Sequence, residues 1–413
     1  MEKKQGLSRL HRVVSGALAV LMVATCVFML AAGIVPNREN LLHAVQYRSK
    51  LNPYLPDGRR ANALELLTAR IRSLESELSL SVYKAETLGQ LNASLQYAIG
   101  KRLVSTGSAQ MVRLNGGYLY DLQEEQSAES AAREILDLRD SLPEGLPFLF
   151  VYEHNTVYDP AMLPAGYDAL DYGAEFADEA VSLLRAGDVP VIDSRDVLGG
   201  GAYPLERLLM RTDQHWTTFA ALVMSRALAV WARDEAGLPV DPALLDAENF
   251  ETETYPGLFL GKYGQRIGAG NVDPDDIILY SPKYETQIAR RSTRSSRTEE
   301  AAGTFSEAVV RWDRLETDGQ GWNIKAYGDY GLSEIADEYR NDNAPDCRIL
   351  IFKDSYSAPI SAFLSLVASD IYAVDLRQVK EPALYYVEQF RPDIVIMAYS
   401  QQMLRNRDYA FAD

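Results

Sequence analysis

The chain has 413 residues, 47% of them hydrophobic, and a net charge of −17 at pH 7, so it is long enough for two or three domains with a sizeable core. Its acidity disfavours nucleic acid or anionic lipid as a partner, and is compatible with neutral glycans or simply with solubility. With only two cysteines and four histidines, the sequence predicts no disulfide, no zinc site and no cofactor, so any chemistry must come from ordinary side chains.

The first predicted element is an apolar run at residues 13–35, which contains no charged residue and follows four basic ones. A run of this length can span a bilayer, and its basic flank keeps the N-terminus inside. The alternative is a cleavable signal peptide, because the small residues 31–33 could serve as a cleavage site. We therefore expect residues 1–36 to be a membrane anchor or signal peptide. The rest lies outside the cytoplasm, either held at the cell membrane by a single pass or secreted.

Residues 37–105 are predicted to form a helical stalk. Five apolar residues within it are spaced alternately three and four apart, which gives a heptad pattern of about two repeats. That length is too short to demand a coiled coil, so we interpret the segment as a stalk or packing helix, with self-association as the alternative. The five residues are Leu64, Leu67, Ile71, Leu74 and Leu78.

Residues 106–413 are predicted to form one α/β domain, because strands and helices alternate along the chain and such alternation favours a doubly wound parallel sheet with helices on both faces. The predicted strands are rich in Val, Ile, Phe or Tyr, and the predicted helices show apolar periodicity. The strands are 147–153, 189–193, 348–353, 371–376 and 393–399, and the helices are 128–141, 175–186, 217–235, 358–368 and 381–390.

A stretch at about residues 250–346 interrupts this alternation. It is rich in Tyr and Gly and has no long periodic segment, so we expect a β-rich insertion. Its arginine-rich run at 290–297 is expected to be a solvated loop, with a contact to an anionic glycan or a partner protein as the alternative. The insertion could wall a cleft, and Tyr330 is a candidate substrate-pocket residue.

Two short strings carry the candidate chemistry. A carboxylate has to hold a histidine in one tautomer before the ring can take a proton from a serine hydroxyl, and Asp213 can hold His215 in this way from the same turn. Ser355 follows an apolar run and is expected at the carboxyl end of a strand, where open α/β sheets bind ligands. We therefore predict Ser355 as nucleophile, His215 as base and Asp213 as its carboxylate. The strings are RTDQHWT at 211–217 and KDSYS at 353–357.

Each string by itself has an ordinary explanation. A lone histidine is more often a hydrogen-bonded structural residue, and Asp-Ser after a strand is a common helix cap. Asp354 is a rival for the carboxylate role, but adjacent residues such as Asp354 and Ser355 seldom direct their side chains at a common third group. Two aromatic neighbours, Tyr356 and Trp216, are candidate substrate-binding residues.

Together the strings resemble the DHHW family of bacterial surface proteins and, more distantly, the SGNH-like domain of the alginate O-acetyltransferases. Further stretches agree in the same order, and the resemblance covers roughly residues 110–405. Two positions depart from the pattern: Gln214 stands where the family has its middle histidine, and Lys353 replaces the glycine of the usual Gly-Asp-Ser block. The further stretches are LNGGYLY at 114–120, IYAVDLR at 371–377 and FRPDIVI at 390–396.

The resemblance implies an SGNH-hydrolase-like fold and serine-dependent O-acetylation of an exopolysaccharide or other cell-envelope glycan. Acetyl-CoA is absent outside the cytoplasm, so the acetyl group is expected to come from a membrane-bound O-acyltransferase partner. Two alternatives stay open. One is a glycan O-acetylesterase, which shares the acyl-enzyme chemistry. The other is a non-catalytic surface protein that binds glycan or acts as a scaffold.

Overall fold

The structure is a computed structural model that describes residues 20–25, 27–28, 32, 85–106, 109–294, 297–316 and 335–406. The predicted heptad pattern and Tyr330 lie outside the described residues, as does most of the predicted anchor. No helix within the described part of the chain is long and apolar enough to cross a membrane. The anchor therefore stays a prediction.

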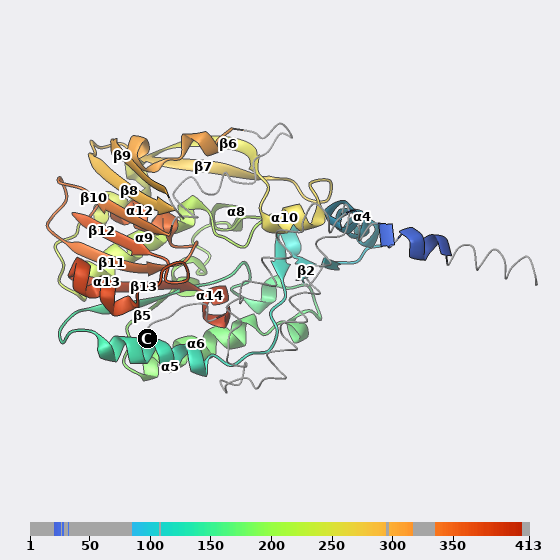
Figure 1. Ribbon diagram of the computed structural model, residues 1–413, viewed down its shortest axis with the longest axis horizontal. Coiled ribbons are helices and arrows are strands. Elements are labelled where there is room, and N and C mark those ends of the chain that lie inside the picture. Colours follow the sequence, from blue (N-terminus) through green and yellow to red (C-terminus); the bar gives the residue numbers. More distant parts are fainter. Residues whose placement is uncertain are drawn as a thin grey trace, which may run out of the picture.

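The described domain is built around one eight-stranded mixed sheet (Figure 1). Five strands are parallel and adjacent, as the alternating pattern predicted. Three more strands, from the region expected to be an insertion, continue the same sheet in antiparallel pairing. In sheet order the strands are β5 (Val191–Asp193), β4 (Phe148–Glu153), β13 (Ile394–Ser400), β11 (Arg348–Lys353), β12 (Asp370–Val374), β10 (Ala336–Arg340), β8 (Ile288–Arg294) and β9 (Arg297–Gly303).

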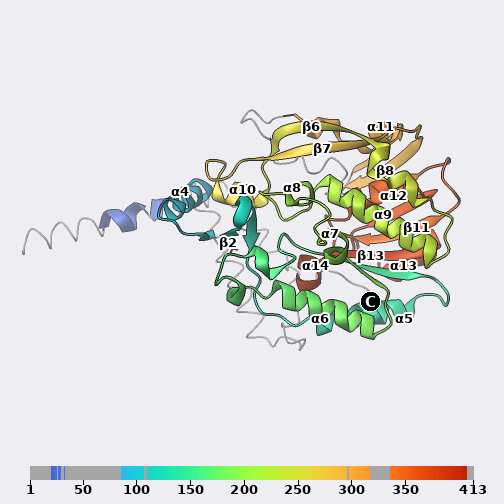
Figure 2. The ribbon, with the colours of Figure 1, turned by 180° about the vertical axis from the view of Figure 1, so that it is seen from behind.

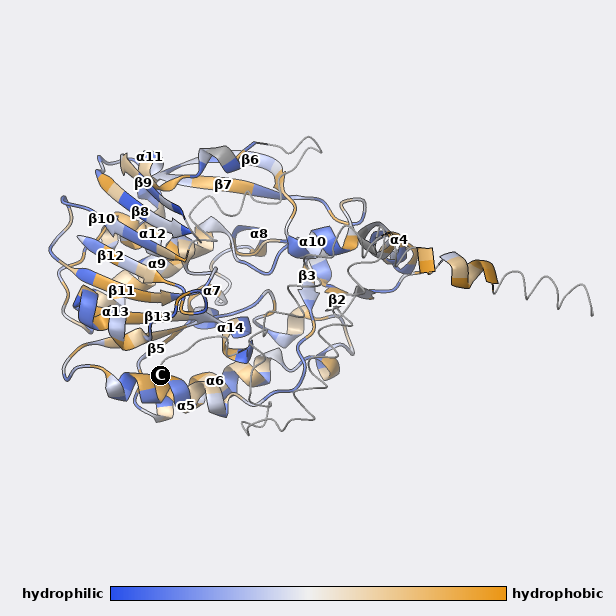
Figure 3. Cartoon of the chain, viewed as in Figure 1, coloured by the Kyte–Doolittle hydropathy of each residue, from blue (hydrophilic) through white to orange (hydrophobic). Residues whose placement is uncertain are grey.

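Helices cover both faces of the parallel part, and successive residues of each central strand enter different cores. In β11, for example, Ile349 and Ile351 belong to one core while Leu350 and Phe352 belong to the other. Figures 1 and 2 view the sheet from opposite sides, and Figure 3 shows apolar residues concentrated in its central strands. The first core is covered by α9 (Thr218–Asp234) and α12 (Ala358–Leu364), the second by α5 (Glu129–Ser141), α6 (Gly173–Ala186) and α13 (Ala383–Phe390).

The region expected to be a β-rich insertion is rich in strands, and part of it continues the main sheet. Its first half is a two-stranded pair, β6 (Phe250–Phe259) and β7 (Asp275–Pro282), with the short helix α10 (Lys262–Ile267) between them. Its second half supplies β8, β9 and β10. Because backbone pairing with β12 continues the sheet, this region widens the domain instead of forming a detachable module.

The expectation of a solvated loop for the arginine-rich run is wrong for residues 290–294, which lie in β8. The strand alternates inward and outward residues, so Arg290 is only 5% exposed whereas Arg291 points outward. Arg290 Nη1 donates to the carbonyl of Val309 at 2.8 Å, and its Nε lies 4.0 Å from a carboxylate oxygen of Asp337. These partners are distant in sequence, which is why the burial was not foreseen.

The described end of the predicted stalk packs on the domain. Helix α4 (Ala85–Ala98) is followed by a small antiparallel sheet of β1 (Leu103–Thr106), β2 (Ala109–Arg113) and β3 (Leu119–Asp121). Ala93 of α4 shares a hydrophobic cluster with residues of α10 and β2. Figure 1 shows α4 beside α10 at one end of the molecule.

Candidate active site

Ser355 lies in the turn that joins β11 to α12, at the carboxyl end of a parallel strand as predicted. Asp354 fixes this nucleophile turn, which we define as residues 354–357. Its Oδ1 accepts a hydrogen bond from the backbone N–H of Tyr356, and its Oδ2 accepts one from that of Ser400, each at 2.9 Å. Asp354, the rival carboxylate, therefore holds backbone.

His215 lies in the histidine segment, which we define as residues 208–217. The segment folds back on itself, because Leu209 and Trp216 form an isolated antiparallel bridge and the N–H of Thr217 donates to the carbonyl of Leu208 at 2.9 Å. Thr217 then caps α9, its hydroxyl accepting from the N–H of Ala220. The tip of the segment, which carries His215, is thus held by a packed helix.

The structure brings the three predicted residues into one line of hydrogen bonds. His215 Nε2 lies 2.8 Å from Ser355 Oγ, and His215 Nδ1 lies 2.5 Å from Asp213 Oδ1. The Asp213 side chain is 6% exposed and that of His215 is 11% exposed, so the line is largely shielded from water. This is the arrangement in which an imidazole can accept a serine proton and remain oriented by a carboxylate.

The Asp213 carboxylate is held from both sides. Its second oxygen accepts the backbone N–H of Lys262, the first residue of α10, at 2.7 Å. Burial raises the pKa of Asp213, but the charge of His215 and the hydrogen bonds from His215 and Lys262 outweigh it and lower the pKa below its ordinary value. The group therefore stays ionised at neutral pH, as an orienting carboxylate must.

Sequence reasoning missed Asp275, a residue of another strand that supports the backbone of the histidine segment. Asp275, at the start of β7, is 8% exposed and accepts the backbone N–H groups of Arg211 and Thr212 at 2.7 and 2.9 Å. The Thr212 hydroxyl also donates to it, at 2.5 Å. Nothing in the sequence near Asp275 indicates this role, because its partners are more than 60 residues away.

Gly261 is the second feature that was missed. A Cβ at this position would lie 2.4 Å from Asp213 Cβ and 2.6 Å from the carbonyl oxygen of Thr212. The N–H of Gly261 donates to the Thr212 hydroxyl at 2.8 Å. The close approach of α10 to Asp213 therefore requires glycine at position 261.

The predicted substrate-binding residues Tyr356 and Trp216 join the two loops. The Tyr356 hydroxyl donates to the carbonyl of Gln214 at 2.7 Å, and Trp216 Nε1 donates to the carbonyl of Tyr356 at 3.1 Å. The Tyr356 ring also lies 4.5 Å from the ring of His215. Tyr356 is 2% exposed and Trp216 is 1% exposed, so both support the site from within. Their contact with substrate stays a prediction, and their burial does not favour it.

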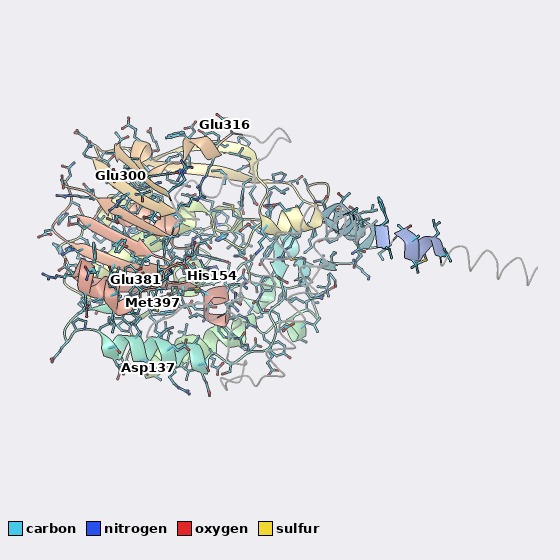
Figure 4. The ribbon with its side chains drawn as sticks, in the orientation of Figure 1. Asp137, His154, Glu300, Glu316, Glu381 and Met397 are labelled. Carbon is cyan, nitrogen blue, oxygen red and sulfur yellow. The ribbon has the colours of Figure 1, made fainter. Side chains whose placement is uncertain are left out.

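His154 directly follows β4, is buried, and is labelled near the centre of the molecule in Figure 4. Its Nδ1 lies 2.7 Å from the hydroxyl of Ser194, and its ring is 6.2 Å from that of Trp216. Burial lowers the pKa of His154 to about 4, so the ring is neutral at physiological pH. This histidine is a packed residue behind the site.

Two surface grooves differ in the segments that line them. The larger, of about 740 Å³, lies on the outer face of β8, β9, β10 and β12, and none of Asp213, His215 and Ser355 lines it. The smaller, of about 310 Å³, is lined by residues 209–211 and 217–219, which flank the tip of the histidine segment, although none of the three residues lines this groove either. Its polar and aromatic lining includes Arg207, Arg211, Tyr118, Phe219 and Tyr280.

No family model and no curated protein matches the sequence, but solved structures match the fold. A DHHW family protein from Eubacterium siraeum superimposes with a TM-score of 0.56 and 17% identity over 76% of this chain and 99% of its own. Bacillus cereus PatB1 with a sulfonyl adduct gives 0.58 and 16% over 72% and 96%. The O-acetyltransferase domain of Pseudomonas putida AlgJ gives 0.40 and 15% over 71% and 92%. The resemblance read from the motifs is thus confirmed at the level of the fold, which this chain shares with a DHHW family protein and with PatB1.

Proposed function

We propose that this protein is an extracytoplasmic O-acetyltransferase in which Ser355, His215 and Asp213 transfer an acetyl group to an exopolysaccharide or cell-envelope glycan. The observation that carries the proposal is the continuous line of hydrogen bonds through these three residues at the carboxyl edge of the parallel sheet. The motif resemblance and the shared fold support the choice of acetyl transfer among serine-dependent reactions.

The first half-reaction loads the enzyme. His215 Nε2 takes the Ser355 proton as Oγ attacks the acetyl carbonyl, and the tetrahedral intermediate collapses when the same imidazolium protonates the departing donor oxygen. Asp213 stabilises the imidazolium in between. The Tyr356 N–H already donates to Asp354, so we assign the Ser355 N–H to the developing oxyanion.

The second half-reaction unloads the enzyme. A sugar hydroxyl gives its proton to His215 while its oxygen attacks the acetyl-Ser355 carbonyl, and the proton returns to Ser355 Oγ as the new ester leaves. We place the acceptor sugar in the groove beside the histidine segment. Aromatic rings and a guanidinium suit a sugar ring with its hydroxyls, and Arg207 is preordered there 3.7 Å over the ring of Phe219.

The acetyl donor is proposed to be a membrane-bound O-acyltransferase, and the N-terminal apolar run to hold the domain at the outer face of the cell membrane. Both proposals rest on the sequence. The donor is proposed because a domain outside the cytoplasm has no acetyl-CoA, and the anchor because residues 13–35 form an uncharged apolar run. A glycan O-acetylesterase is the second candidate, since water can replace the sugar hydroxyl in the second half-reaction. A glycan-binding surface protein with an unused triad is the third.

A covalent probe tests the nucleophile directly. The full chain is treated with a sulfonyl fluoride, which would leave a sulfonyl adduct of the kind described for PatB1, and the modified peptide is located by mass spectrometry. We expect modification of Ser355, its loss in Ser355→Ala and His215→Ala, and its persistence in Ser141→Ala, a control on the exposed end of α5. Absence of the adduct, or an adduct indifferent to His215, would favour the binding protein.

An activated acetyl ester then separates transfer from hydrolysis. Candidate glycans are added to the acetylated enzyme, and acetyl release to water is compared with acetyl gain by the glycan. Transfer to glycan supports the proposed function, and unchanged release to water supports the esterase. In the proposed acceptor groove, Arg207→Ala should raise the KM for the glycan and leave turnover of the ester alone unchanged.

A further inference from the structure

Glu153 is a completely buried acid close to the nucleophile turn. It is the last residue of β4, with 0% of its surface exposed, and it pairs in register with Ser400 of β13. Ser400 in turn donates its N–H to Asp354. The end of β4 is thus connected, across β13, to the residue that precedes the nucleophile.

The Glu153 carboxyl contacts the turn at both of its ends. Its Oε1 accepts from the Ser357 hydroxyl at 2.7 Å. Asp354 acts on the Glu153 carboxyl both through its charge and as a side-chain hydrogen-bond partner. Ser357 occupies the N-cap position of α12 but makes no capping hydrogen bond with its side chain, because its hydroxyl turns to Glu153 and to the carbonyl of Ala398. The contact is made at the expense of a helix cap.

The surroundings of the two carboxyls favour one proton between them. If Glu153 were ionised, its Oε2 would be a buried acceptor with no donor among the described residues, and two buried negative charges would face each other. Asp354 receives two backbone N–H groups, which stabilise an anion, whereas the carboxyl of Glu153 receives none from the residues that the structure describes. The proton therefore belongs on Glu153 Oε2, with Asp354 as its acceptor.

We propose that Glu153 is a neutral carboxylic acid that positions the nucleophile: it donates Oε2–H to Asp354, accepts the Ser357 hydroxyl at Oε1, and so fixes the turn carrying Ser355 from both ends. Burial, together with the charge of Asp354, raises the pKa of Glu153 well above its ordinary value, which is consistent with this assignment. Glu153 touches no reacting atom, and it acts through Asp354 and Ser357.

Infrared spectroscopy tests the proton without using the activity. The wild type at about pH 8 should show the carbonyl stretch of a protonated carboxylic acid, and Glu153→Gln should lack it. Asp275→Asn is the matched control, because burial raises the pKa of Asp275 only to about 6 and its carboxylate should be ionised at that pH. An identical spectrum for wild type and Glu153→Gln would overturn the proposal.

Kinetics test the positioning, which rests on the proposed role of Ser355. A glutamine keeps one donor and one acceptor, so Glu153→Gln should retain most of the kcat for the activated ester. Glu153→Met keeps neither and should lower kcat about 100-fold with KM unchanged. A Met variant as active as the wild type, or a Gln variant as slow as the Met variant, would overturn the positioning role.

Two further variants keep the test usable if Glu153→Met does not fold. Ser357→Ala removes one arm of the network and should lower kcat. Ser361→Ala, one turn along α12, removes a hydroxyl that, among the described residues, bonds backbone carbonyls alone, those of Ser357 and Ala358, and should leave kcat unchanged. An inactive wild type that shows the infrared band would count against the proposed function while supporting the proton on Glu153.

Discussion

The nucleophile turn and the histidine segment are each held by a buried carboxylate, but the two carboxylates come from different parts of the chain. Each is fixed by a buried carboxylate that accepts two backbone N–H groups, Asp354 in the turn and Asp275 under the segment. Asp354 belongs to the turn that it fixes, whereas Asp275 arrives from β7. The serine is therefore placed by the parallel sheet itself, and the histidine depends on the β6–α10–β7 region having folded against it.

Removal of the reacting groups is the strongest test of whether the two loops form one unit. Ser355→Ala and His215→Ala should each lower kcat for an activated ester about 10⁴-fold, because each abolishes activation of the nucleophile. The double variant should be no slower than either single one. Multiplicative losses, measured in the same ester assay, would mean that the two loops act independently.

The pH dependence of stability tests two buried groups near the site next. Burial lowers the pKa of His154 to about 4, so between that value and the unfolded pKa of 6.5 the unfolded chain binds a proton that the folded chain does not. Stability from this group is complete above pH 6.5 and falls by about 3 kcal/mol as the pH drops to about 4. Urea unfolding at several pH values should show that His154→Gln lacks this loss.

Asp275 should act in the opposite sense on the histidine side. Burial raises its pKa from 3.8 to about 6, so in that window the folded state holds a proton that the unfolded state has released. Its contribution to stability is therefore largest at low pH and declines as the pH rises through 6. Between about pH 4 and 6 the contributions of Asp275 and His154 to the pH dependence of stability therefore have opposite signs and partly offset each other. A steep wild-type profile that His154→Gln leaves unchanged would contradict this balance.

Removing the Asp275 carboxylate from beneath the histidine segment should lower kcat more than it lowers the stability of the fold. Asp275→Asn places an amide N–H against backbone donors and should displace the tip that carries His215, with a loss of about 100-fold in kcat and little change in KM. Asp273→Asn, two residues earlier on an exposed position, is the matched control. If Asp275→Asn turned over the ester at the wild-type rate, the histidine would not depend on β7.

The smallest effect is expected from crowding Asp213. Gly261→Ala forces α10 away from the Asp213 carboxylate, which weakens the Lys262 hydrogen bond, and should reduce kcat about tenfold with a loss of about 1 kcal/mol in stability. Gly270→Ala adds the same methyl group where no atom lies within 4 Å and should change neither quantity. If the two variants had the same kcat and the same thermal stability, the close packing of α10 against Asp213 would not be needed for the site.

The sequence was sufficient wherever the relevant signal is short-range. The parallel strands were predicted to within a few residues, because strands buried on both faces read as continuous apolar runs. Asp213 and His215 were paired because they lie two residues apart, and Ser355 because it follows a strand. These features depend on neighbours along the chain, which the sequence displays directly.

Only the tertiary structure decided which distant segments support those residues. Asp275 and Gly261 meet the histidine segment, and Glu153 meets Asp354, across separations of tens to hundreds of residues. Likewise β8, β9 and β10 joined the main sheet through pairing that starts at β12, which turned an expected solvated run into a strand with Arg290 buried. Sheet order is set by backbone hydrogen bonds, which are the same for every residue type. The side chains by themselves therefore indicated the candidate reacting groups, and the tertiary structure determined which residues hold them in place.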